Sequence, residues 1–105
     1  MVLKYDIEIQ NSAVHGNLRK ITNQIYKLLP EREEGLDWKT PLSTIMEELA
    51  GMDLLLTDQH HLLFPLLCKL EGLLTLTEEK DFFLYRRTIF ECLSLVNNIM
   101  VQWQD

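Results

Sequence analysis

Residues that interrupt helices are scarce in this chain of 105 residues, which contains four glycines and three prolines. Such a composition favours long elements joined by short connections, and it argues against a β architecture with many turns. Apolar residues make up 47% of the chain and charged residues 25%, the balance of an ordinary globular protein. The length suits a single domain over residues 1–105. The expected fold class is therefore all-α.

Cysteines are few, with two in the chain, and neither a long apolar run nor the pattern of a secretory leader is found. Cys68 and Cys92 both fall within apolar helical stripes, so we expect buried, reduced thiols with a structural role. The most apolar run, residues 62–76, is interrupted by a proline and two charges and is shorter than the roughly 20 residues that cross a bilayer. No basic stretch followed by a small-residue cleavage site opens the chain. These features predict a cytoplasmic protein that does not bind membranes.

Basic residues are outnumbered, with 10 against 16 acids and a net charge of −6. Residues 31–58 hold eight acids and two bases and so carry the whole imbalance, because the +2 of residues 1–30 cancels the −2 of residues 59–105. An acidic protein repels phosphate backbones, so we expect no direct binding of nucleic acid. The acidic segment instead favours a partner protein with a basic groove.

The stretch from Asp81 to Trp103 shows the clearest periodicity in the chain. Bulky residues recur there every seven positions, and a second set interleaves with them at the three-then-four spacing of one helical stripe: Phe82, Ile89, Val96 and Trp103 with Tyr85, Cys92 and Ile99. A helix that is apolar over so wide an arc contacts two or three neighbours. This segment is predicted to be the hub of the fold.

Three further helices are predicted upstream. The first runs from Asn11 or Ser12 to Pro30, and the second starts at Thr40 as its cap, with Pro41 in the first position. Residues 30–39 form the acidic linker between them. The third helix contains Pro65, which either kinks it or marks its beginning, and ends near Leu74. Short connections favour a four-helix up-and-down bundle.

The connections of the last helices and the first residues of the chain carry their own patterns. Thr75 with Glu78 three residues on predicts a capping box for the final helix. Residues 3–10 alternate apolar and polar side chains, the period of a half-buried strand. The segment 2–10 is therefore interpreted as a strand that pairs with a second copy or another protein, with an extended arm or a helical stripe as alternatives.

Opposite charges at the edges of two apolar stripes predict a structural ion pair. Asp53 lies beside the stripe of the second helix and Arg86 between Phe82 and Phe90. An unpaired charge there would lower the stability of the fold by several kcal/mol, so we expect Asp53 and Arg86 to form an ion pair. The adjacent His60 and His61 point about 100° apart on a helix and form no metal site. No metal and no cofactor are predicted.

The alternative prediction is that the acidic residues form the metal site of an enzyme. Glu31 and Glu34 have the spacing of the Glu-Glu-x-x-Glu stretch of the all-α nucleotide pyrophosphatases, which the chain resembles in this element. The later Glu-x-x-Asp is replaced by Glu48 and Asp53, five residues apart instead of three. The resemblance implies a magnesium-dependent hydrolase that holds its metal at Glu33, Glu34, Glu47, Glu48 or Asp53.

Binding to another protein is the function that the sequence favours. Apolar side chains outside the buried stripes and the acids of residues 31–48 are the candidate contacts: Glu31, Glu33, Glu34, Asp37, Trp38, Glu47, Glu48, Phe83, Leu84 and Phe90. Inhibitors, immunity proteins and adaptors act in this way, by analogy of class. Assembly as a homodimer or a structural subunit, through the final helix or the N-terminal strand, is the second mechanism considered.

Overall fold

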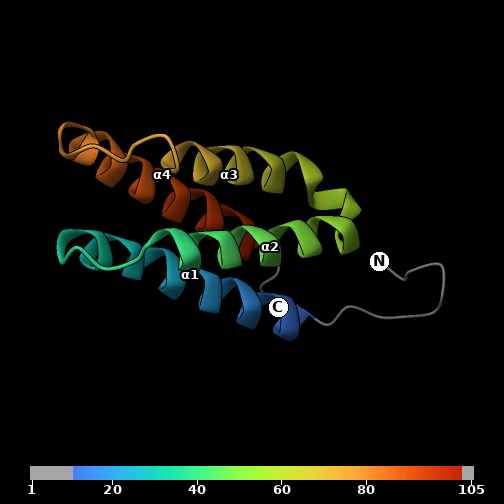
Figure 1. The fold of residues 1–105 in the computed structure, drawn as a ribbon. Coiled ribbons are helices and arrows are strands. Elements are labelled where there is room, and N and C mark those ends of the chain that lie inside the picture. The colour runs from blue at the N-terminus through green and yellow to red at the C-terminus, as the bar shows by residue number, and fades with distance from the viewer. Residues whose placement is uncertain (1–10, 103–105) are drawn as a thin grey trace.

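The computed structural model describes residues 11–102, which form four helices (Figure 1). Their bounds are Asn11–Glu33 for α1, Lys39–Leu55 for α2, His60–Leu73 for α3 and Phe82–Val101 for α4. Two short 3-10 helices, Thr57–Gln59 (η1) and Glu79–Asp81 (η2), lead into α3 and α4. The predicted strand of residues 2–10 and the heptad residue Trp103 lie outside the described part. In residues 11–102, no helix is long and apolar enough to cross a membrane.

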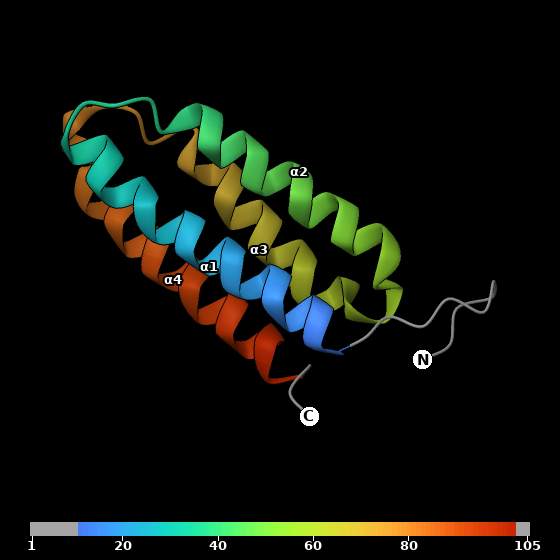
Figure 2. The ribbon, with the colours of Figure 1, turned by 90° about the horizontal axis from the view of Figure 1, so that it is seen from below.

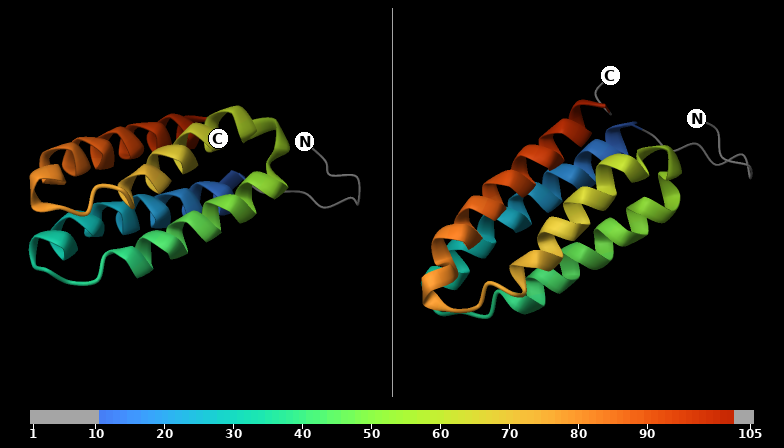
Figure 3. Two further views of the ribbon diagram at one scale, coloured as in Figure 1. Left: turned by 45° about the horizontal axis from the view of Figure 1, so that its top comes forward. Right: turned by 90° about the horizontal axis from the view of Figure 1, so that it is seen from above.

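Successive helices run in opposite directions, so the molecule is the predicted up-and-down four-helix bundle (Figure 1, Figure 2). Both α1 and α3 pack against α2 and α4. The helices α2 and α4 therefore lie diagonally across the bundle, as Figure 3 shows. The α1–α2 and α3–α4 connections share one end of the bundle, and the α2–α3 connection lies at the other end, near the start of α1 and the end of α4 (Figure 1).

The core consists of one apolar stripe from each helix. The predicted apolar ladder of α4 is confirmed, because Phe82 is half-buried and the rest of the described ladder is buried, together with Leu93: Tyr85, Ile89, Cys92, Val96 and Ile99. The helix packs mainly on α1 and α3, as each of the other helices packs on two neighbours, so α4 is not a hub for all three. Opposite it lie the equivalent positions of the other helices, among them Leu18, Ile25, Ile45 and Leu66. Each fully buried side chain of this size stabilises the fold by about 1.5–3 kcal/mol.

One residue of α3, Cys68, lies elsewhere than predicted. Cys68 is exposed, because it follows the buried Leu66 by two positions and so points about 200° around the helix from it. The helix ends at Leu73, one residue before the predicted end; Leu73 is buried and Leu74 is exposed. Of the two alternatives predicted for Pro65, the start of the helix is wrong, since α3 starts at His60 and continues through the proline.

The predicted linker of residues 30–39 is shorter in the structure, because α1 continues past Pro30 to Glu33. Gly35, with φ +74°, then ends the helix in a Schellman motif. The amide of Gly35 donates to the Arg32 carbonyl at 3.1 Å, and that of Leu36 donates to the Glu31 carbonyl at 2.8 Å. A proline removes a single hydrogen bond from the helix ladder, and the closed C-terminal motif holds the extra turn.

The capping residues of α2 and of η2, the short helix that leads into α4, also differ from the prediction. Asp37, rather than Thr40, caps α2: its carboxylate accepts from the amides of Lys39 at 3.0 Å and Thr40 at 3.2 Å. Before α4, the amide of Glu78 donates to Asp81 at 3.3 Å, whereas the Thr75 hydroxyl donates back to α3. Each cap lies three residues from the predicted one, because a side chain reaches whichever free amide the turn presents.

Candidate protein-binding surfaces

The predicted ion pair between Asp53 and Arg86 is wrong. Asp53 contacts Nδ1 of His60 at 2.8 Å and 2.9 Å through its two oxygens, and the guanidinium of Arg86 lies 5.3 Å from the ring centre of Phe90. Because α2 and α4 run in the same direction on a diagonal, the end of α2 and the start of α4 lie at opposite ends of the bundle. Each charge therefore finds a local partner.

Acidic side chains gather at the end of the bundle where the α1–α2 and α3–α4 turns meet. Glu33, Glu34 and Asp37 are exposed there on one turn, and Glu78 and Glu79 on the other. The hydroxyl of Thr40, followed by its amide, holds the pKa of the Asp37 carboxyl below its usual value. This acidic end could meet a basic surface.

The other predicted acids do not join this group. Glu31 is half-buried, and Glu48 contacts Lys20 on α1 at 3.7 Å. Glu47 lies on the opposite flank of α2, beside α3. No three metal-ligating side chains converge anywhere in residues 11–102. The acids thus occupy several separate surfaces.

Trp38 belongs to the interior rather than to a binding surface. Its side chain is 9% exposed, and its ring meets that of Tyr85 edge-on, with centroids 5.0 Å apart. Next to it, the guanidinium of Arg32 lies 4.2 Å from the Tyr85 ring centre and also faces Phe82. The position of Trp38 next to a helix start concealed this role, because turn residues are usually exposed.

Arg32 connects the two turns of the acidic end, a role that the sequence did not reveal. Its guanidinium donates to the carbonyl oxygens of Leu76 and Glu78, the latter at 2.8 Å. The same group lies over the rings of Trp38, Phe82 and Tyr85. A planar guanidinium can bond in its plane and stack through its faces at once. The one available signal was a single base within the stretch Glu-Arg-Glu-Glu.

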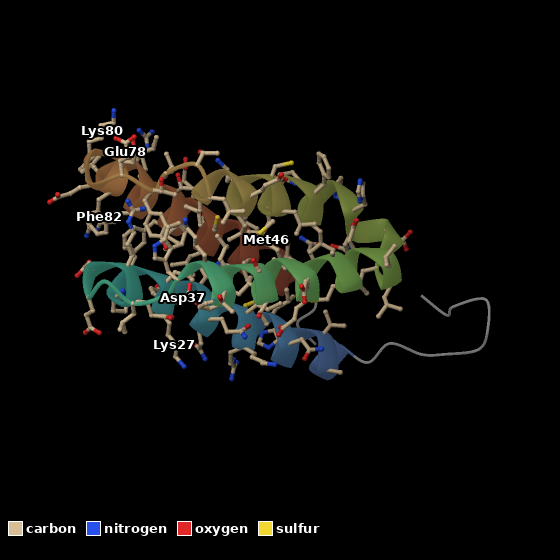
Figure 4. All side chains as sticks on the ribbon, viewed as in Figure 1. Lys27, Asp37, Met46, Glu78, Lys80 and Phe82 are labelled. Atoms are coloured by element: carbon tan, nitrogen blue, oxygen red, sulfur yellow. The ribbon has the colours of Figure 1, made fainter. Side chains whose placement is uncertain are left out.

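A shallow groove runs between α2 and α3. We call it the α2–α3 groove; its apolar lining comprises Met46, Ala50, Phe64, Leu67 and Cys68. The side chain of Met46 lies between the two ribbons in Figure 4. Glu47 on α2 and Glu71 on α3 form opposite rims. Phe64, Leu67 and Cys68 have i, i+3 and i+4 spacing on α3. The sequence could have predicted this surface if these residues had been assigned to a second stripe, distinct from the buried one.

The two cysteines are chemically distinct. Cys92 is buried in the core, and burial raises the pKa of its thiol to about 12, with opposing smaller effects of Lys69 and Glu91. Cys68 is exposed in the α2–α3 groove. A thiol reagent should therefore reach Cys68 first, because reaction requires the thiolate and access to it.

The exposed apolar residues of α4 fall on two different faces. Phe83 is 77% exposed and Phe90 45%, and their spacing of seven places them on one stripe, which we call the α4 ridge. Leu84 lies about 100° from Phe83 around the helix and so belongs to the other flank. Arg86 and Arg87 lie midway along the ridge, one on each side. The three predicted α4 contacts therefore do not form one patch.

A fourth surface, on the outer face of α1, carries basic residues. Arg19, Lys20 and Lys27 line a shallow depression with Asn23 and Gln24. Lys27 points away from the bundle in Figure 4. The cations of this surface oppose the net charge of the chain and offer a contact for anionic groups.

Comparison with protein-family models, with curated proteins and with solved structures found no match to this chain.

Proposed function

We propose that the chain acts by binding another protein, as an inhibitor, immunity-type protein or adaptor, and that the α2–α3 groove is its receptor site. The observation that carries the proposal is the combination of an apolar floor with acids on both rims. Met46 and Leu67 form part of the floor, and Phe64 stands 54% exposed beside them. Exposed aromatic groups beside a concave apolar surface are typical anchors of protein interfaces.

The ligand that suits this groove is an amphipathic helix with basic flanks. Two antiparallel helices leave a groove of helical width, and an apolar stripe at i, i+3, i+4 and i+7 fits such a groove. Glu47 and Glu71 would pair with cations on either side of the stripe. Such charges contribute mainly to orientation and association rate. The proposal places the protein in the cytoplasm, where an exposed thiol such as Cys68 stays reduced.

Photocrosslinking through Cys68 tests the proposal. The exposed thiol is labelled with benzophenone maleimide while Cys92 stays buried, and the labelled protein is irradiated in an extract of its native host. We expect a discrete crosslinked species that excess unlabelled protein abolishes. The charge-reversal double variant Glu47→Lys/Glu71→Lys, labelled in the same way, should lose it.

A matched control carries the label elsewhere. In a Cys68→Ser background, Asn23→Cys presents a thiol on the outer face of α1, which is exposed and remote from the groove. This variant should give no crosslink of the same mass. Equal yields from the two label positions would contradict a role for the α2–α3 groove.

The acidic end is a second candidate surface, for a partner with a basic groove. It is favoured by the meeting of two acidic turns, with Glu33 and Glu34 on one and Glu78 and Glu79 on the other. Binding there would weaken steeply with salt, because exposed charges are screened. A partner whose capture is lost in Glu33→Gln/Glu34→Gln, but kept in Glu47→Lys/Glu71→Lys, would assign binding to this end instead.

A further inference from the structure

The occupant of the α2–α3 groove can be sought on the chain itself. We propose that the α4 ridge of one copy docks into the α2–α3 groove of a second copy, an inference that rests on the proposed role of the groove. The ridge has an apolar stripe flanked by two cations, and the groove has an apolar floor flanked by two anions. The two surfaces are therefore apolar at their centres and opposite in charge at their edges.

The ridge is built from Phe83 and Phe90, with Arg86 and Arg87 between them. Seven residues of α-helix span about 10 Å, so the two rings stand two turns apart along one side of α4. The arginines lie at the midpoint, about 100° apart around the helix, and so point to opposite sides of the stripe. Both are exposed, and Arg86 packs on the Phe90 ring.

The groove has a matching arrangement of charge. Glu47 projects from α2 and Glu71 from α3, on the two sides of the floor. The two helices are antiparallel, with Glu47 eight residues before the end of α2 and Glu71 eleven residues after the start of α3, so the two acids lie within about one helical turn of each other along the bundle. A helix laid in the groove with Phe83 and Phe90 inward brings one arginine to each glutamate. Of the ion pairs formed within residues 11–102, none uses any of these four charges.

The ridge and the groove lie on opposite sides of one molecule. On α4, Glu91 contacts Lys69 of α3 at 3.6 Å, and on the other flank Met100 accepts from Thr22 of α1 at 3.8 Å. Phe83 and Phe90 lie further round on the flank toward α1, so they face away from α2 and α3. One copy therefore cannot fill its own groove.

A contact between two different surfaces is heterologous, and it leaves a free ridge and a free groove at the ends of every open assembly. Such contacts grow into open chains unless the rotation closes a ring. With ridge and groove on opposite sides, the copies would stack side by side. We therefore expect the average molecular mass to rise with protein concentration, without a plateau at the mass of a dimer.

Sedimentation equilibrium of the purified chain at low salt, from micromolar to millimolar concentration, tests the contact. The ridge variant Arg86→Glu/Arg87→Glu and the groove variant Glu47→Lys/Glu71→Lys should each weaken self-association by about tenfold or more, because like charges then face each other. Both variants should keep the helical circular dichroism of the parent, since all four side chains are exposed.

Mixing the two variants gives the discriminating result. The ridge variant keeps a normal groove and the groove variant keeps a normal ridge, so an equimolar mixture should form a 1:1 complex and stop there. The control Arg19→Glu/Lys27→Glu has the charge change of the ridge variant on the outer face of α1, and it should associate like the parent.

Three outcomes would overturn the proposal. The parent chain could stay monomeric at millimolar concentration, it could stop at a dimer that both double variants preserve, or the mixed variants could form no complex. A monomer that still gives a groove-dependent crosslink to a larger species in extract would leave the proposed function intact, with a foreign helix as the ligand. Loss of both results would remove the groove as a binding site.

Discussion

Arg32 lies where two turns of the bundle meet, and its bonds hold them together. Its guanidinium donates to carbonyl oxygens of the α3–α4 turn and stacks on Trp38, Phe82 and Tyr85. The Tyr85 hydroxyl in turn donates to the Leu28 carbonyl at 3.4 Å. Arg32 on α1 therefore links the α1–α2 turn, the α3–α4 turn and the beginning of α4.

Replacing Arg32 by methionine should lower the free energy of unfolding by about 2–4 kcal/mol, through lost charge-assisted hydrogen bonds and stacking. Arg32→Lys should recover part of the loss, because an ammonium keeps the charge but not the planar donor set. Urea unfolding followed by circular dichroism measures the difference. The control Arg19→Met, on the exposed face of α1, should stay within about 0.5 kcal/mol of the parent. Equal losses at both positions would refute the role of Arg32.

Asp37 makes the stability of the bundle depend on pH. Its folded pKa lies below the ordinary value of 3.8, so its carboxylate stabilises the folded state above that pH. The stabilisation is lost as the pH falls through the folded pKa. We therefore expect the Tm of Asp37→Ala to lie below that of the parent at neutral pH, and the gap to shrink as the pH falls below 3.8 and through the folded pKa. A gap that is constant with pH would show that the carboxylate charge does not contribute.

The ends of the helices are set by individual residues rather than by propensity along the whole element. Gly35 closes α1 with φ +74°, a conformation in which a side chain is strained. Gly51 lies instead inside α2, and a Cβ added there would meet nothing within 4 Å. The same substitution should consequently have opposite effects at the two glycines.

Gly35→Ala should destabilise the fold by about 1–2 kcal/mol, the cost of left-handed backbone for an L-residue. Gly51→Ala should stabilise it by roughly 0.5–1 kcal/mol, because alanine loses less conformational freedom in a helix. Thermal unfolding of both variants at one pH compares them directly. Destabilisation by Gly51→Ala would mean that α2 is packed more closely at this point than the structure shows.

At the scale of the whole molecule, the four stripes form one core, so we expect the bundle to open as one unit. Cys92 reports on this opening, because its thiol is buried in α4 while Cys68 is exposed. In the native protein, an aromatic disulfide reagent should modify Cys68 quickly and Cys92 only after unfolding.

The substitution Ile45→Val tests this cooperativity. It lies on α2, diagonally across the bundle from Cys92, and removes one buried methyl group at a cost of about 0.5–1.5 kcal/mol. Modification of Cys92 should become about two- to tenfold faster, whereas the rate at Cys68 should not change. If the Cys92 rate stayed the same, α4 would open independently of α2.

Periodicity predicted the helices because burial repeats along each of them. The ladder from Phe82 to Ile99 and the stripes of α1 and α2 could be read directly, since a helix facing a core must place apolar groups every three or four residues. Helix ends were predicted less well. The caps Asp37 and Asp81 were missed because several polar residues near each end can reach a free amide, and the geometry of the turn selects one.

Which surfaces exist was decided by packing. The sequence by itself determined that the chain has four amphipathic helices, a net charge of −6 and more apolar residues than its buried stripes need. Only the tertiary structure separated Asp53 from Arg86, buried Trp38, and joined flanks of α2 and α3 into a groove with two acidic rims. The physical reason is that periodicity gives the angle of a residue around its own helix, measured from the buried face. A binding surface depends in addition on which other helix lies beside that residue.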